Sequence, residues 1–138
     1  ISNEKRGAEQ ERVLVRATNL LNAPVQSESG KRIGEISDLL IDTVNQRYSF
    51  AVIRFDEKIR LGREKTRGRV APIPWCKCAF GLSNPSSPIV ILNKDLKQLR
   101  GRTVAEDELG FVATENWAEN MYRVYGQDPY WLKTSSRR

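Results

Sequence analysis

The sequence contains no histidine, and its two cysteines, Cys76 and Cys78, are separated by a single residue. The missing histidine excludes hydrolysis by a Ser-His-Asp or Cys-His set. Without histidine or a second cysteine pair, one chain cannot supply four soft ligands for a structural zinc ion. On a strand the two cysteines would share one side with Cα atoms about 6.5 Å apart, near the limit for a disulfide. We therefore expect two small packed residues, no metal, no cofactor and no catalytic set.

Long apolar runs are also missing, because no stretch of about 18 apolar residues is present that could form a transmembrane helix. The hydrophobic content, 39%, is low for a globular chain. Polar ends account for part of this, and we expect residues 1–11 to be a flexible segment and residues 133–138 a flexible basic end. Because the first residue is not Met, we expect either that an N-terminal piece has been removed or that a signal peptide has been cleaved.

What is present is a series of short apolar segments separated by turn residues, which is typical of an all-β barrel or sandwich. The predicted strands are residues 12–16, 34–42, 48–55, 69–75 with a continuation over 76–80, and a last strand over 88–92. The strands 34–42 and 48–55 carry apolar residues on both faces, so both faces need cover. In strict alternation Ile36 and Leu40 share one face of the first of these strands, and Leu39 and Ile41 share the other.

The segment of residues 30–42 contains the candidate structural residues. Gly30 is predicted to supply a positive φ for a hairpin turn, and Gly34 begins the strand that follows. Asp38 and Asp42 are four residues apart, so about 13 Å separates them on a strand, too far for a pair of glycosidase carboxylates. We therefore assign Asp38 to a strand bend and Asp42 to the next turn, where Asn45 suits the left-handed conformation.

The C-terminal part has a different character. Residues 93–99 are predicted to form a short helix capped by Asn93, and residues 107–115 are expected to be mostly loop. Residues 116–125 are predicted to form a second helix that ends at Gly126, followed by an aromatic tail. These apolar side chains are too many to leave in water, so they pack either on the same barrel or on a neighbouring chain in a homodimer. The candidates for this packing are Trp117, Met121, Val124, Tyr125, Tyr130 and Trp131.

Positive charge is concentrated in one loop. Residues 58–69 contain six Lys or Arg and one Glu, within a net charge of +6 for the whole chain. Interspersed basic residues and glycines could follow the phosphates of nucleic acid or another anionic polymer, but no aromatic residue is present in the loop for base stacking. The alternative is a solvated hairpin loop. The candidate anion-binding residues are Arg60, Arg63, Lys65, Arg67 and Arg69.

The order and spacing of these segments resemble the PRC-barrel domains. The matching pieces are Leu21-Asn22-Ala23-Pro24-Val25, residues 29–42, residues 48–55, Val70-Ala71-Pro72-Ile73-Pro74-Trp75, and residues 89–92 running into Leu96 and Leu99. The ending Val124-Tyr125-Gly126-Gln127-Asp128-Pro129-Tyr130-Trp131 is similar to a bacterial subgroup whose members are often exported. The basic loop departs from the Gly- and Phe-rich loop usual in the family, and only Leu61-Gly62 matches it.

This resemblance implies a mainly β protein with a small SH3-like PRC barrel over residues 12–100, a short helix after the last strand, and a C-terminal helix and aromatic tail over residues 101–132. It implies a non-enzymatic interaction or assembly module that binds another protein or itself, and export rather than a cytoplasmic location. Two alternatives remain. One is anion or nucleic-acid binding through the basic loop, and the other is a small enzyme that uses Asp, Glu, Cys or Lys alone.

Overall fold

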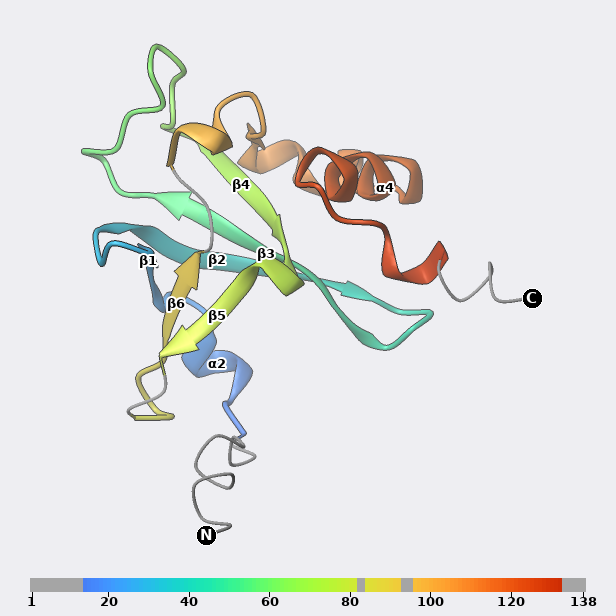
Figure 1. The fold of residues 1–138 in the computed structure, drawn as a ribbon, viewed down its shortest axis with the longest axis horizontal. Helices are drawn as coiled ribbons and strands as arrows, with labels where there is room; N and C mark the ends of the chain where they lie inside the picture. Colours follow the sequence, from blue (N-terminus) through green and yellow to red (C-terminus); the bar gives the residue numbers. More distant parts are fainter. Residues whose placement is uncertain (1–13, 82–83, 93–95, 133–138) are drawn as a thin grey trace, which may run out of the picture.

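The computed structural model describes residues 14–81, 84–92 and 96–132, and its main feature is a seven-stranded sheet in the order β5-β6-β1-β2-β3-β4-β7 (Figure 1). All neighbouring strands are antiparallel except β1 and β6, which are parallel. The mainly β fold predicted from the sequence is confirmed. The strands are β1 (Pro24–Ser27), β2 (Arg32–Asp42), β3 (Arg47–Phe55), β4 (Arg69–Pro74), β5 (Cys78–Gly81), β6 (Ile89–Leu92) and β7 (Val104–Ala105).

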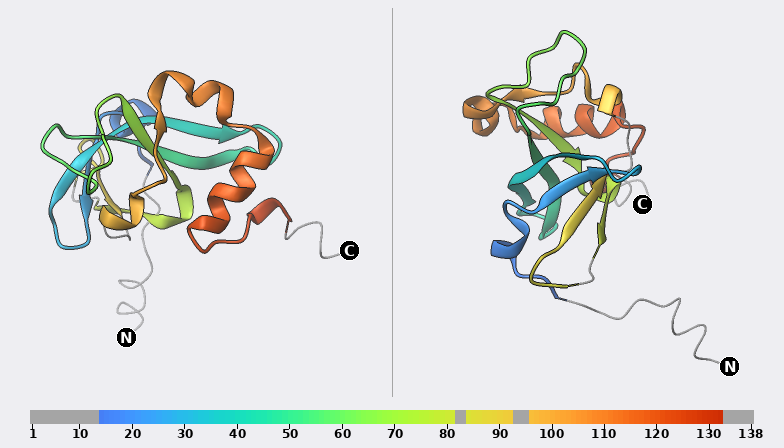
Figure 2. Two further views of the ribbon diagram at one scale, coloured as in Figure 1. Left: turned by 90° about the horizontal axis from the view of Figure 1, so that it is seen from above. Right: turned by 90° about the vertical axis from the view of Figure 1, so that its left-hand side faces the viewer.

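Short helices connect and cover the strands. Among the described residues, no helix has the length and apolar content needed to cross a membrane. In Figures 1 and 2 the loop between β3 and β4 and the turn between β2 and β3 lie at opposite ends of the long axis. The α-helices are α2 (Ala17–Leu20), α3 (Leu109–Val112) and α4 (Glu115–Val124), and the 3-10 helices are η1 (Trp75–Lys77), η2 (Leu96–Leu99) and η3 (Glu106–Glu108).

The long strands β2 and β3 organise the sheet. Gly30 has a φ of +92° in the turn before β2, as the sequence predicts, and β2 and β3 cover both strands predicted at this point. β3 is buried over most of its length because it is rich in β-branched and aromatic residues and has a strand on each side. The main core fills the curl of the sheet with apolar side chains from several strands and η2, among them Val25, Ile33, Ile36, Ile53, Ala71, Ile73, Val90, Leu92 and Leu99.

A β-bulge overturns the predicted face assignment within β2. Ile36 pairs with Ile53 and Asp38 with Val52, so Ser37 has no partner in the register. The extra residue inverts the alternation beyond it. Ile36 and Leu39 therefore both pack with the main core, whereas Leu40 packs with Val52, Val70, Leu109 and Val104 in a second cluster. The prediction that Ile36 and Leu40 share a face is wrong for this reason.

Several other predictions about the strands are corrected. The described part of the predicted first strand, residues 14–16, has no regular structure, and residues 12 and 13 lie outside the described residues. Residues 76–80 do not continue β4, because η1 breaks the chain and β5 then pairs with β6. β6 is not the last strand, since β7 pairs with the start of β4. The turn residue with positive φ is Gln46, at +57°, rather than Asn45.

The two cysteines consequently lie in different elements. Cys76 is exposed in η1, whereas Cys78 is partly buried and packs against the main core. Burial, with a smaller effect of Cys76, raises the pKa of the Cys78 thiol to about 12. The prediction that both cysteines share one side of a strand, and that both are packed, is therefore wrong for Cys76.

The C-terminal part is more helical than predicted. η3 and α3 occupy most of the segment expected to be loop, and η2 forms part of the helix predicted over residues 93–99, whose proposed cap, Asn93, lies outside the described residues. The predicted second helix is confirmed as α4. Thr114 caps it by accepting a hydrogen bond from the Trp117 N–H, and a left-handed Gly126 ends it, with the Gln127 N–H donating to the Tyr122 carbonyl.

Candidate functional site

The turn between β2 and β3 is fixed by Asp42. Its Oδ1 accepts hydrogen bonds from the backbone N–H groups of Val44 and Asn45, at 2.9 and 3.0 Å. Its Oδ2 accepts from the side-chain amide of Asn45 at 2.9 Å and from the hydroxyl of Tyr130 at 2.5 Å. One carboxylate therefore organises the turn and ties the C-terminal aromatic tail to it.

These contacts perturb the acidity of both partners. Burial alone would raise the pKa of Asp42, but the hydrogen bonds from Tyr130, Asn45 and Val44 together lower it from 3.8 to about 2. Burial and the hydrogen bond to Asp42 raise the pKa of Tyr130 to about 12. Asp42 is therefore ionised and Tyr130 neutral at physiological pH, which is the charge state that this hydrogen bond needs.

We expect stability to fall in acid through Asp42. Because its folded pKa lies below its unfolded value, its contribution is complete above pH 3.8 and is lost as the pH falls towards 2. An Asp42→Asn variant should be less stable at neutral pH and should lose less of its unfolding free energy across this pH window. Urea unfolding at a series of pH values measures both effects. Parallel pH profiles for the two proteins would contradict the assignment.

Aromatic side chains of α4 and the tail pack on β3 beside this turn. The ring of Phe50 contacts those of Trp117 and Tyr122, with both pairs of centroids 5.1 Å apart. Tyr122 also contacts Tyr130 and Trp131, and its hydroxyl donates to the Ser49 carbonyl at 2.7 Å. Ser49 has no partner in the β2–β3 register, so a second bulge coincides with this attachment point. The tail thus contacts the sheet of its own chain.

The six residues predicted to pack at this end are placed differently from one another. Trp117, Tyr130 and Trp131 belong to the cluster around Tyr122, and Arg47 lies over the ring of Tyr130 at 3.8 Å. Met121 and Tyr125 instead pack with the main core. Val124 is 48% exposed, so its predicted position on the packed face of α4 is wrong. The most deeply buried residues of this segment are Tyr122 and Tyr125, each 1% exposed. The packed face of α4 is therefore rotated away from Val124, which was predicted to lie on it with Trp117 and Met121.

A groove of about 320 Å³ opens between the β2–β3 turn and the N-terminal part of α4, and we call it the hairpin groove. At its edge Ile41 is 60% exposed and Val44 is 86% exposed, unusual values for large aliphatic residues. The indole N–H of Trp131 is buried without a hydrogen-bond partner among the described residues. The groove is lined by Leu40, Ile41, Asp42, Val44, Asn45, Ser49, Phe50, Ala113, Thr114, Glu115, Trp117, Ala118 and Trp131.

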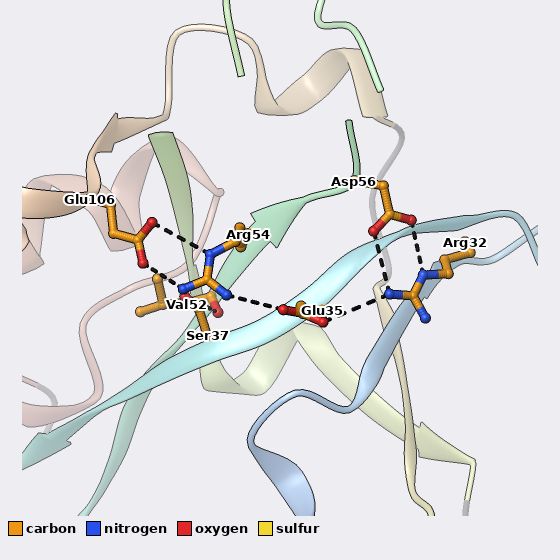
Figure 3. Close-up of polar contacts among 7 residues, drawn as sticks. All are labelled: Arg32, Glu35, Ser37, Val52, Arg54, Asp56 and Glu106. Atoms are coloured by element: carbon orange, nitrogen blue, oxygen red, sulfur yellow. Dashed lines mark hydrogen bonds and ion pairs between the residues drawn. The ribbon is translucent and has the colours of Figure 1, made fainter. Parts of the chain in front are cut away.

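A row of alternating charges crosses the sheet at its other end (Figure 3). Arg32 pairs with Asp56 at 2.9 Å and with Glu35 at 3.9 Å. Arg54 pairs with Glu35 at 3.0 Å and with Glu106 at 2.7 Å. The row links β2 and β3 to η3, so it holds the segment after β7 against the sheet.

Breaking this row should have a small, salt-dependent effect. All members are partly exposed, so replacing Arg54 with Met is expected to cost about 1 kcal/mol or less of unfolding free energy. The cost should shrink as salt is added, because salt screens exposed pairs. Urea unfolding at low and high salt measures this, and a double-mutant cycle with Glu106→Gln isolates one pair. A large loss independent of salt would show that Arg54 acts through packing instead.

The structure separates the predicted anion-binding residues. Arg69 is held inside the fold, since it donates to the hydroxyl and carbonyl of Thr103 at 2.7 and 2.8 Å. Arg60 is exposed and donates to backbone carbonyls of its own loop. Three further basic side chains are exposed and form no ion pair or hydrogen bond with the described residues, namely Arg63, Lys65 and Arg67.

The predicted structural residues also have defined surroundings. Asp38 lies just after the bulge, and its Oδ1 accepts the Leu39 N–H at 2.8 Å. Gly34 lies against β3, where a Cβ would be 2.1 Å from the Arg54 carbonyl oxygen. Sequence reasoning missed Tyr122 and Ser49, although tyrosines three residues apart at positions 122 and 125 do mark one side of a helix. No sequence signal indicated that a bulge would place Ser49 beneath α4.

Residues 13–77 match the family model of the PRC-barrel domain. No curated protein matches the chain. The matched segment includes β1 to β4, which is the part of the sheet that forms the turn and most of the main core. This match supports the PRC-barrel resemblance for the barrel strands and does not extend to α4 or the aromatic tail.

Proposed function

Starting from the PRC-barrel match over residues 13–77, which suggests a small interaction or assembly module, we propose that this chain is a non-catalytic protein-binding module. Its docking surface is the hairpin groove. The observation that carries this proposal is the exposure of Ile41 and Val44 beside an apolar depression. Such a combination is typical of surfaces that bind another protein.

The chemistry of the hairpin groove favours an extended apolar segment as the occupant. Leu40, Phe50 and Trp117 supply an apolar floor. Trp131 also lines the groove, and its indole N–H has no acceptor among the described residues. That N–H is buried, so a bound segment would contact the ring of Trp131 rather than this donor, and its aliphatic side chains would cover Ile41 and Val44. A second copy of this chain is the alternative occupant, and it would make a homodimer.

Replacing Val44 with Lys should weaken this binding about tenfold, because a charge would then lie where an apolar contact forms. The fold should be unaffected, since Val44 is 86% exposed. The measurement is selection of peptides from a random library on the whole chain, followed by titration of the selected peptides. We expect apolar peptides that bind the unaltered chain and not the variant.

Val124→Lys is the matched control, because Val124 is exposed on α4 and does not line the groove. Peptides that tolerate Val44→Lys, or an absence of any enriched peptide, would contradict the proposal. Light scattering over a range of concentrations separates the two occupants. A dimer that Val44→Lys dissociates would assign the groove to a second copy of the chain.

A further inference from the structure

The basic loop lies at the opposite end of the molecule from the β2–β3 turn (Figures 1 and 2). It forms one wall of a second groove. We call this second groove the basic groove. It has a volume of about 800 Å³ and lies between the loop, the end of β3 and η3. Its charged lining residues are Arg54, Asp56, Glu57, Arg60, Arg63, Glu64, Lys65, Arg67 and Glu106.

Most carboxylates of the basic groove already have a partner within the fold, either a cation or hydrogen-bond donors. Asp56 pairs with Arg32, and Glu106 pairs with Arg54. Glu64 accepts hydrogen bonds from the Gly101 N–H at 2.7 Å and from the Thr103 hydroxyl at 2.6 Å. Among the described residues that line the groove, Glu57 is the carboxylate without such a partner.

The basic side chains are not neutralised in the same way. Arg60, Arg63, Lys65 and Arg67 are exposed and form no ion pair with a described carboxylate. Among the described residues, Glu57 and Glu64 are the lining carboxylates without an ion pair, so these four cations leave a surplus of positive charge in the groove. Ion pairing therefore leaves this surface more basic than its composition alone indicates.

A second segment extends the positive surface beyond the loop. Gly62 has a φ of +64°, and the guanidinium of Arg100 lies so close that a Cβ on Gly62 would be 2.2 Å from it. Lys97 lines a further depression beside Arg60 and Gly62. Arg100 and Lys97 likewise form no ion pair with a described carboxylate. Six cations without an ion pair among the described residues therefore lie around Gly62. They are Arg60, Arg63, Lys65, Arg67, Lys97 and Arg100.

We propose that the basic groove binds nucleic acid through its phosphate backbone, without reading the base sequence. Four of the six cations are arginines, whose planar guanidinium groups bind phosphate oxygens in pairs. A concave surface suits a linear phosphate chain. The aromatic residue in the lining, Phe55, is only 8% exposed, so base stacking, the usual source of base contacts on single strands, is not offered.

A membrane surface fits these observations less well. The apolar residues of the basic loop, Ile59 and Leu61, are buried, so the loop has no side chain to insert among lipids. The exposed large apolar residues of the described chain lie in other segments. Arg69 does not contribute to this surface, because it is bound to Thr103.

The test is fluorescence anisotropy of the whole chain with labelled single-stranded RNA and DNA of two unrelated sequences. Binding should be similar for the two sequences and should weaken about a hundredfold between 50 and 200 mM salt if about five phosphates are contacted. Triple reversal of Arg63, Lys65 and Arg67 to Glu should weaken binding at least about tenfold and lower the salt slope by about 2. Glu57→Gln should bind more tightly than the unaltered chain.

The control is a triple reversal of Arg16, Lys31 and Lys77 to Glu, which changes the net charge equally and lies outside the groove lining. Thermal melting checks that both triple variants remain folded. Equal weakening by the two variants, salt-independent binding, or no nucleic-acid binding at low salt would overturn the proposal. Equal affinity for poly-glutamate, or binding to vesicles of anionic phospholipid in preference to nucleic acid, would overturn it as well.

Discussion

Replacing Gly34 with Val is expected to unfold the chain at room temperature or to leave it only marginally stable. A Cβ at this position would lie 2.1 Å from the Arg54 carbonyl oxygen and 3.1 Å from the Cα of Phe55. These are backbone atoms of β3, which cannot move away freely because Arg54 and the residues before it also pair with β4. Such overpacking costs about 3 kcal/mol or more, a large part of the stability of a small domain.

Circular dichroism during heating and urea unfolding measure this effect. Gly34→Ala tests the same contact with the smallest possible side chain and should still lose most of that stability. Gly110→Ala is the matched control, because no atom lies within 4 Å of a Cβ at that position in α3. This control should be neutral or slightly stabilising. A Gly34→Ala variant as stable as the control would contradict the close approach of β2 and β3.

Replacing Tyr122 with Ala should cost about 3–5 kcal/mol, because this fully buried ring joins α4, the aromatic tail and β3. The tail should detach together with the ring. We therefore expect the fluorescence of Trp131 to shift towards that of a solvent-exposed indole. The measurement is made at low temperature or with a stabilising osmolyte, so that the rest of the chain remains folded.

Tyr122→Phe isolates the hydroxyl from the ring. It keeps the contacts with Phe50 and Trp131 and removes the hydrogen bond to the Ser49 carbonyl, so a loss of about 1–3 kcal/mol is expected. Tyr48→Phe provides a matched removal of a tyrosine hydroxyl, on a half-buried residue of β3. If Tyr122→Ala cost no more than Tyr48→Phe, the C-terminal helix would not be attached to the sheet as described.

The sequence predicted those elements whose signals are local. The β-branched and aromatic run of β3, the Gly30 turn, and the Gly126 stop of α4 each act within a few residues of the signal. The bulges at Ser37 and Ser49 were not predictable, because they depend on how β2 and β3 adjust to side chains that are distant in the sequence, such as Tyr122 of α4. The wrong face assignment of Leu40 follows directly from the first of these bulges.

In the candidate sites, too, local sequence signals were predictive and long-range contacts were not. Composition identified the basic loop, but its residues differ in ways that only tertiary contacts decide. Arg69 is bound to Thr103, 34 residues away, whereas Arg63 remains unpaired. Similarly, the apolar pattern identified α4 as a packed helix, but the inward position of Tyr122 depends on where Phe50 and Trp131 meet it.

The proposed protein-binding role is tested most directly by photo-crosslinking in the organism that makes the chain. A benzophenone amino acid placed at Val44 would lie at the edge of the hairpin groove, and the same residue at Val124 would lie on exposed α4 outside it. We predict one discrete crosslinked product from position 44, either with another protein or with a second copy of the chain, and none from position 124. No product from position 44, or the same products from both positions, would contradict the role of the hairpin groove.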